Sequence, residues 1–149
     1  MNNYELMLKQ TKALFHPDWV AYLSNVSALL NENLEDINWA GFYIVKDGRL
    51  VLGPFQGKVA CVEIEYGKGV CGTAWKENKV QLVDNVHEFE GHIACDSASN
   101  SEIVLPIHNS NDEVIALLDI DSPSFSRFDE NDKEGLLQIV KEIEESIRW

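Results

Sequence analysis

The stretch "SEIVLPIHNSNDEVIALLDIDS", residues 101–122, decides the fold of this chain. Two largely apolar runs, 101–107 and 114–122, enclose the polar segment "HNSNDE". Short apolar runs joined by Asn, Ser and Asp are typical of a β-hairpin. A second hairpin is predicted where "KDG" joins "NWAGFYIV" to "RLVLGPFQ", over residues 38–56. Two hairpins predict a sheet that is largely antiparallel.

Helical patterns lie at both ends of the chain. The segments "NNYELMLKQTKALF" and "PDWVAYLSNVSALLNEN" precede the first strand, and Pro17 is expected in the first turn of the second helix. The segment "FDENDKEGLLQIVKEIEESIRW" predicts a terminal helix with Asp129 as its N-cap. Its apolar face is Leu136, Ile139, Val140, Ile143 and Ile147.

The middle of the chain predicts shorter elements. "VACVEIEY" (59–66) and "KVQLVD" (79–84) read as short strands, and "GKGVCGTAWKEN" as a loop entering a helix that ends near Asn78. Residues 85–100 predict a long polar loop with about one turn of helix, and long loops in compact domains are often functional. We therefore expect a single α+β domain over residues 1–149, in which terminal helices pack on a largely antiparallel central sheet.

Composition limits the classes of function. The 149 residues include 25 acidic and 12 basic side chains, for a net charge of −13, so nucleic acids and anionic membranes are poor partners. The sequence shows no apolar leader and no apolar run that approaches the ~20 residues of a membrane helix. We expect a cytoplasmic protein, whose three cysteines are kept reduced and point to chemistry, a metal or burial.

The three cysteines occupy different settings. Cys71 lies where a glycine-rich loop meets a helix, which predicts a lowered thiol pKa and backbone amides able to bind an anion. Cys61 lies on the strand upstream. Burial as a small apolar core residue is the alternative for both Cys61 and Cys71, and is the simpler interpretation for Cys61. Cys95 lies in the polar loop. His87, His92 and Cys95 are also residue types that zinc accepts, but their spacing matches no standard zinc module.

Acidic and aromatic side chains form a further set of candidates. Asp119 and Asp121 are two residues apart on a strand and therefore face the same side, and Glu102 opens the facing strand. Converging carboxyls would bind an ammonium group and raise one another's pKa, which makes a general acid available. An exposed, charged sheet face is the alternative. Trp39 and Tyr43 share a strand face and are either core or the wall of a pocket for a thioether or methyl group.

Four segments carry a family resemblance. "NWAGFY", "GKGVCGTAW", "IACDSASNSEIVLPI" and "VIALLDIDSPSFSRFDENDKEGL" closely resemble the free methionine-(R)-sulfoxide reductases, which are single GAF domains. The likeness covers nearly the whole chain. The pattern of three cysteines is its most specific part, because general GAF sensor domains are not expected to carry it.

The resemblance implies a thiol-based reaction with free L-methionine-(R)-sulfoxide, of the kind used against oxidative stress. Cys95 matches the nucleophile, which becomes a sulfenic acid that Cys61 resolves as a disulfide. Thioredoxin then reduces that disulfide. Cys71 matches the third cysteine, whose part varies, and its resolving role relative to Cys61 stays open. We expect no cofactor and no bound metal.

The resemblance also implies the binding residues. Trp39 and Tyr43 match the pocket for the methyl group. Glu102, Asp119 and Asp121 match the acidic set that holds the ammonium group and polarises the sulfoxide oxygen. The substrate carboxylate is expected at the backbone amides of Val70, Cys71 and Gly72.

Two other classes of protein are compatible with these residues. A GAF sensor that binds a small ligand, or that is oxidised only once, is the second hypothesis, and a zinc-binding domain is the third. GAF domains often pair, so we expect a homodimer in which the N-terminal helices are one candidate surface.

Overall fold

The computed structural model describes residues 3–91 and 99–147. Of the helices in these ranges, none has the length and apolar character needed to cross a membrane. The elements, in chain order, are α1 (Asn3–Ala13), α2 (Trp19–Asn33), β1 (Trp39–Lys46), β2 (Arg49–Gly57), β3 (Glu63–Glu65), α3 (Gly69–Glu77), β4 (Gln81–Val83), the 3-10 turn η1 (Val86–Glu88), β5 (Ser101–His108), β6 (Val114–Ser122) and α4 (Glu130–Ser146).

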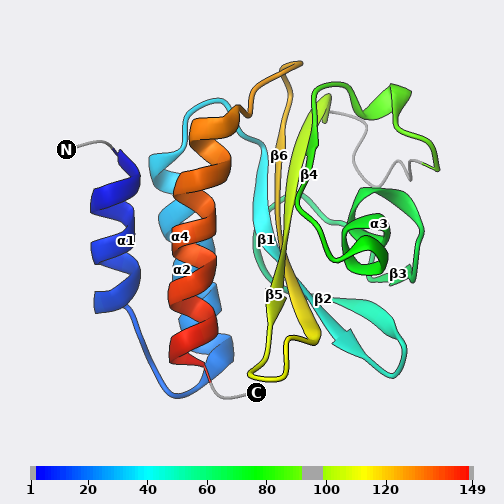
Figure 1. Cartoon of the computed structure of the whole chain (residues 1–149). Coiled ribbons are helices and arrows are strands. Elements are labelled where there is room, and N and C mark those ends of the chain that lie inside the picture. Colours follow the sequence, from blue (N-terminus) through cyan, green and yellow to red (C-terminus); the bar gives the residue numbers. More distant parts are fainter. Residues whose placement is uncertain (1–2, 92–98, 148–149) are drawn as a thin grey trace.

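The strands of the described ranges form one six-stranded antiparallel sheet, in the order β3-β2-β1-β6-β5-β4. Helices α1, α2 and α4 lie on one side of this sheet, and α3 lies on the other side (Figure 1). Both predicted hairpins are present, as β1–β2 and β5–β6. The predicted α+β architecture with a largely antiparallel sheet is confirmed.

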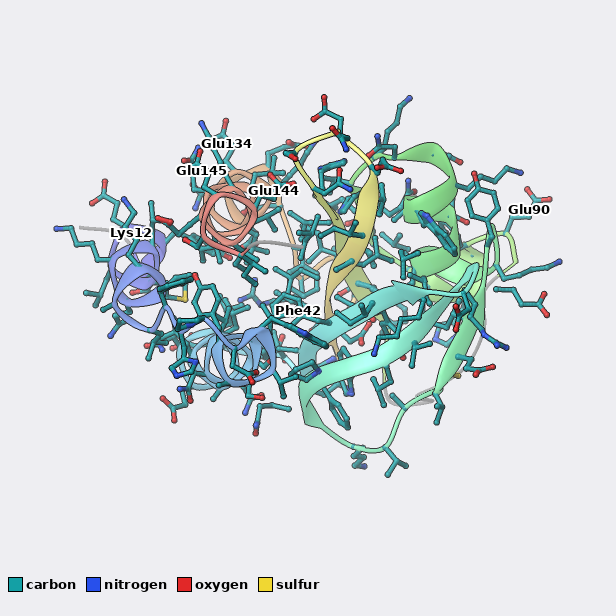
Figure 2. The ribbon with its side chains drawn as sticks, turned by 90° about the horizontal axis from the view of Figure 1, so that it is seen from below. Lys12, Phe42, Glu90, Glu134, Glu144 and Glu145 are labelled. Carbon is teal, nitrogen blue, oxygen red and sulfur yellow. The ribbon has the colours of Figure 1, made fainter. Side chains whose placement is uncertain are left out.

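Side chains of the central strands alternate between two hydrophobic cores. Phe42 of β1 and Leu118 of β6 pack with the helices in the first core, and Figure 2 shows Phe42 directed from the sheet toward the helical layer. Their chain neighbours Tyr43 and Leu117 belong to a second core beneath α3. Because successive residues of a strand face opposite sides, residues two apart on one strand share a core.

The helix boundaries confirm one predicted cap and correct another prediction. Asp129 caps α4 in a capping box with Asp132, and the five predicted apolar residues of this helix are buried. Helix α2 begins at Trp19, with Asp18 accepting hydrogen bonds from the Val20 and Ala21 amides. The placement of Pro17 in the first turn is therefore wrong, because Asp18 takes the capping position after it.

The segment "VACVEIEY" is only partly a strand. Residues 63–65 pair with β2, and the Val62 carbonyl accepts a hydrogen bond from the Leu52 amide of β2 over 2.8 Å. The residues before Val62 are instead contacted by side chains of β1. The Trp39 indole N–H donates to the Lys58 carbonyl over 3.1 Å, and the Tyr43 hydroxyl donates to the Cys61 carbonyl over 2.9 Å. These two aromatic side chains therefore hold the segment that precedes β3 against β1.

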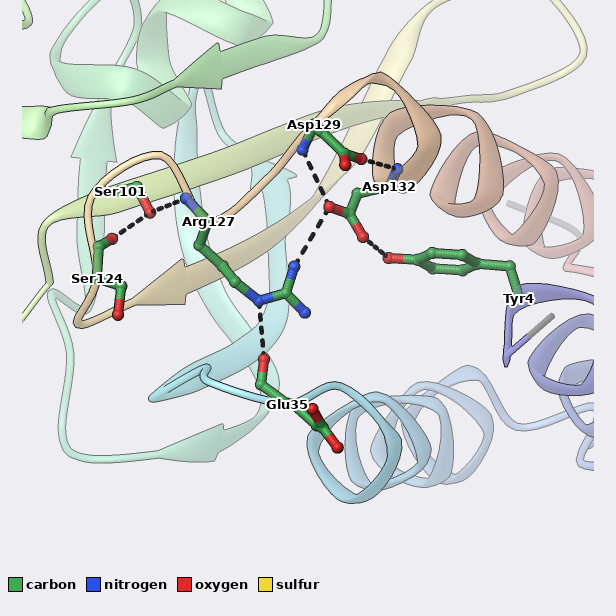
Figure 3. Close-up of polar contacts among 7 residues, drawn as sticks. All are labelled: Tyr4, Glu35, Ser101, Ser124, Arg127, Asp129 and Asp132. Carbon is green, nitrogen blue, oxygen red and sulfur yellow. Dashed lines mark hydrogen bonds and ion pairs between the residues drawn. The ribbon is translucent and has the colours of Figure 1, made fainter.

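A polar network joins the helical layer to the start of β5 (Figure 3). The Asp132 carboxylate accepts a hydrogen bond from the Tyr4 hydroxyl over 2.6 Å and forms an ion pair with Arg127 over 3.2 Å. Arg127 also donates from Nε to the Glu35 carbonyl over 2.8 Å and from its backbone to the Ser101 hydroxyl over 3.3 Å. The network therefore connects α1, the end of α2 and α4 with the residue that precedes Glu102.

Replacing Asp132 with alanine tests how much this network stabilises the fold. We expect Asp132→Ala to lower the free energy of unfolding by about 2–3 kcal/mol, because partly buried charged and phenolic donors lose their acceptor. Urea unfolding measures the loss. Glu134→Ala, an exposed position on the same helix, is the control and should change stability by less than about 0.5 kcal/mol. An equal effect of the two substitutions would contradict the assignment.

Candidate active site

Three carboxyl groups converge on the sheet face that α3 covers. Glu102 of β5 pairs with Asp121 of β6, and Asp121 in turn pairs with Trp39 of β1. Asp119 lies two residues earlier on β6 and therefore faces the same side. All three acidic residues are at most 9% exposed. The structure brings the predicted acidic set together, and the alternative of an exposed, charged sheet face is wrong.

Aromatic rings form one wall beside these acids. The rings of Trp39 and Tyr43 are stacked with centroids 6.0 Å apart, and Phe55 of β2 stacks on Trp39 at 5.1 Å. Gly41 lies between the two aromatic residues of β1, and a side chain there would collide with the backbone and Cβ of Phe55. The wall thus depends on a glycine. Phe55 was not predicted from the sequence, where its only signal is its position in the facing strand of the hairpin.

The first turn of α3 offers backbone donors. Among the described residues, no backbone acceptor binds the amides of Val70 and Cys71, as is usual at the start of a helix. The Gly72 amide, in contrast, donates to the Lys68 carbonyl over 2.9 Å. Gly72 instead allows close packing, since a Cβ at this position would lie 2.6 Å from the Glu65 carbonyl oxygen. The anion-binding donors available here are therefore Val70 and Cys71.

Cys71 lies beside a carboxyl group, a contact that the sequence did not predict. Its sulfur lies 3.4 Å from Asp119 Oδ2, and the residue is buried. Burial, together with the repulsion that Asp119, Glu102 and Asp121 would exert on a thiolate, raises the pKa of Cys71 well above its ordinary value. The prediction that the helix start lowers this pKa is wrong. Proximity of the carboxyls and desolvation outweigh the helix N-terminus.

Glu102 is the strongest candidate for a proton donor. Burial raises the pKa of Glu102 well above its ordinary value, and the neighbouring Asp119 and Asp121 raise it further by repulsion and by hydrogen bonding to its protonated form. Burial also raises the pKa of Asp119, but hydrogen bonds from Glu102 and Cys71 oppose that shift. The group therefore keeps a proton on Glu102 to higher pH than an isolated glutamate would, as a general acid requires.

The acids, the aromatic wall and α3 enclose one cavity of about 60 Å³. The residues that line this cavity include a set predicted from the sequence: Trp39, Tyr43, Val70, Cys71, Glu102, Asp119 and Asp121. The remaining lining residues were not predicted: Ala60, Ile64, Lys68, Gly69, Val86 and Ser99. The missed residues are mostly small or apolar and come from loops and short elements, so no local pattern marks them.

The cysteines differ in oxidation state. Cys61 is disulfide-bonded and half-buried, and Cys71 is a free thiol. Cys95, the predicted nucleophile, and His92, a candidate zinc ligand, lie outside the described residues. His87 is exposed, and its Nε2 lies 2.8 Å from Asn100 Oδ1.

Comparison with known proteins identifies close relatives. Residues 23–148 match the family model of the GAF domain. The free methionine-R-sulfoxide reductase of Escherichia coli is 60% identical over 126 residues, which are 85% of this chain and 76% of that protein. The solved fRMsr of Staphylococcus aureus in complex with substrate is 54% identical, with a TM-score of 0.92 over 98% of this chain and 96% of that one. The free methionine-R-sulfoxide reductase of Neisseria meningitidis, solved with its substrate, is 41% identical, with a TM-score of 0.92 over 96% and 87% of the two chains.

The raised pKa of Glu102 predicts a pH-dependent effect on stability. Above the ordinary pKa of glutamate (about 4.3), the unfolded chain releases this proton while the folded chain retains it, so folding becomes less favourable as pH rises. We expect Glu102→Gln to be more stable than the wild type at about pH 7 and to lose this advantage toward about pH 4. Urea unfolding across this pH range measures the difference.

Glu65→Gln, an exposed substitution on β3, is the matched control and should differ from the wild type by a small, constant amount. A Glu102→Gln variant that is less stable than the wild type at every pH would refute the assignment.

Proposed function

We propose that this chain, which belongs to the GAF-domain family of free methionine-R-sulfoxide reductases, reduces free L-methionine-(R)-sulfoxide to methionine by thiol chemistry. The observation that carries the proposal is the convergence of three buried carboxyls, a stacked aromatic wall and a helix start in one cavity. Two relatives with TM-scores of 0.92 were solved with their substrate.

The geometry supports recognition of a free amino acid. Asp119 and Asp121 hold the α-ammonium group, and the amides of Val70 and Cys71 receive the α-carboxylate. A methionine residue within a polypeptide has neither charged group. The methyl group lies against Trp39 and Tyr43, where contact between sulfur and an aromatic ring is favourable.

The first chemical step transfers oxygen from the substrate to Cys95. The Cys95 thiol attacks the sulfoxide sulfur, and Glu102 donates a proton to the sulfoxide oxygen, which is otherwise a poor leaving group. The bond between the two sulfurs and the S–O bond of the substrate break as the protonated oxygen moves to the Cys95 sulfur. Methionine leaves, Cys95 becomes a sulfenic acid, and the former thiol proton restores the proton on Glu102. The sulfoxide is reduced by two electrons, and the cysteine is oxidised by two.

The second step closes a disulfide. The Cys61 thiol attacks the Cys95 sulfenic acid, and water leaves. This pairing is supported by the disulfide-bonded state of Cys61 and the free state of Cys71 in a chain with three cysteines. Thioredoxin then exchanges its dithiol for the disulfide and restores both thiols. Cys71, whose thiol is held in its neutral form, is the third cysteine and is less suited to attack. We place the reaction in the reducing cytoplasm, in a homodimer.

Replacing Cys95 tests the reaction and its nucleophile together. We expect NADPH consumption, coupled through thioredoxin and thioredoxin reductase, with the R epimer of free methionine sulfoxide and not with the S epimer. Cys95→Ser should abolish turnover, because a serine hydroxyl cannot form the sulfenic acid and Cys61 and Cys71 are not placed in the role of the nucleophile. Cys71→Ser is the matched control and should retain turnover.

Each contrary result has a distinct meaning. No multiple turnover with either epimer would reject the enzyme and favour a GAF sensor that is oxidised only once. R-specific turnover that survives in Cys95→Ser and is lost in Cys71→Ser would keep the function but move the nucleophile.

Replacing Glu102 tests the proton donor. We expect Glu102→Gln to lower kcat by about 10²–10⁴-fold, because the amide cannot protonate the departing oxygen. Wild-type kcat should fall as pH rises through the raised pKa of Glu102, and the variant should lack this limb. Steady-state rates across pH measure both effects. An unchanged profile in the variant would move the donor role to another group.

A further inference from the structure

Three buried groups in the cavity have the arrangement of metal ligands. The sulfur of Cys71 and one carboxylate oxygen each from Glu102 and Asp119 all lie within 4.8 Å of one another. They come from α3, β5 and β6, so the packing of three elements fixes their positions. Cys71 and Asp119 are each 5% exposed, and Glu102 is 8% exposed.

Asp119 gives a second and independent indication of a ligand. Its Oδ2 lies beside the Cys71 sulfur, whereas its buried Oδ1 has no hydrogen-bond partner among the described residues. Leaving a buried carboxylate oxygen without a partner is costly, so this atom is set to bind a group that enters the cavity. Asp119 is one of the residues that line that cavity.

Within the described ranges, no basic side chain neutralises these three groups through an ion pair. Lys68 lines the same cavity but its side chain is exposed. A cation that replaces the protons would remove both the desolvation cost and the mutual repulsion of the acids.

The ligand types select the class of metal. One thiolate with two carboxylates suits a soft or borderline ion such as Zn²⁺ or Cd²⁺, whereas Mg²⁺ and Ca²⁺ prefer oxygen ligands alone. With bonds of about 2.3 Å to sulfur and 2.0 Å to oxygen, tetrahedral ligands lie about 3.5 Å apart. The Cys71 sulfur and Asp119 Oδ2 lie 3.4 Å apart. The cavity of about 60 Å³ also leaves room for a water as fourth ligand.

We propose that Cys71, Glu102 and Asp119 bind Zn²⁺ in the absence of substrate, which makes zinc a competitive inhibitor of the reaction. Binding displaces the Cys71 thiol proton and any proton on Glu102, and leaves the oxidation state of every group unchanged. The competition rests on the proposed function, because the same carboxylates then hold the substrate ammonium group. The metal site itself rests only on the three ligand residues.

The test isolates Cys71 and observes the metal–sulfur bond directly. In the full chain with Cys61→Ser and Cys95→Ser, Cys71 is the only remaining cysteine. Titration with Cd²⁺ should produce an ultraviolet thiolate-to-cadmium charge-transfer band that saturates at one metal per chain, and Zn²⁺ should displace it. Adding Cys71→Ser should abolish the band.

Carboxylate variants separate a built site from binding to the thiol alone. Asp119→Asn or Glu102→Gln, added to the same background, should weaken cadmium binding by at least about tenfold, and Glu65→Gln on β3 should not. Circular dichroism shows whether each variant is folded. If Asp119→Asn does not fold, Glu102→Gln, which is expected to be more stable than the wild type, alone tests whether a carboxylate binds the metal. Absence of the band, or equal affinity in both carboxylate variants, would overturn the proposal.

Free L-methionine tests the competition. Saturating methionine should lower cadmium affinity in proportion to its own occupancy, measured separately by calorimetry. Cadmium affinity that stays constant while methionine is bound would overturn the overlap of the two sites. If methionine does not bind at all, the overlap of the two sites fails, whereas the charge-transfer band and its dependence on Asp119 still decide the metal site, and turnover of the R epimer separately decides the proposed function.

Discussion

The central strands β1, β5 and β6 are covered on both faces, so each of their side chains has to be accommodated in one of two cores. Toward the helices the strands present mainly apolar residues, such as Phe42 and Leu118, and this core stabilises the domain. Toward α3 the same strands present aromatic rings and carboxyls. The alternation of β-strands thus places a chemically demanding site directly behind a conventional core, without a separate domain to support it.

Burial of three carboxyls beside a thiol determines the chemistry of the site. Ionised acids in a dry environment repel one another and lose solvation, so protons are retained and the group is poised to accept a cation or to donate a proton. This arrangement opposes folding, and the fold has to supply the compensating stability elsewhere. The network around Asp132 and the helical core hold the start of β5, and hence Glu102, in place.

Sequence patterns predicted the elements and faces of this protein well, because hairpins, caps and strand alternation are local. The two hairpins and the facing positions of Asp119 and Asp121 followed from such patterns. The pKa of Cys71 did not, since it depends on which groups surround the thiol after folding. The length of β3 also escaped prediction, and the segment before it is bound by Trp39 and Tyr43, whose side chains are distant in sequence. Residues that only line the cavity leave no periodic signal.

The sheet that separates the two cores also has an evolutionary consequence. Adjacent positions on β1, β5 or β6 have different neighbours, whereas alternate positions share them. Substitutions at every second position can therefore remodel the cavity while the intervening positions preserve the helical packing. The helix-facing positions of each strand can therefore stay nearly unchanged during evolution while the cavity-facing positions change and alter the chemistry. The two sets of alternating positions in one strand are then under separate selection.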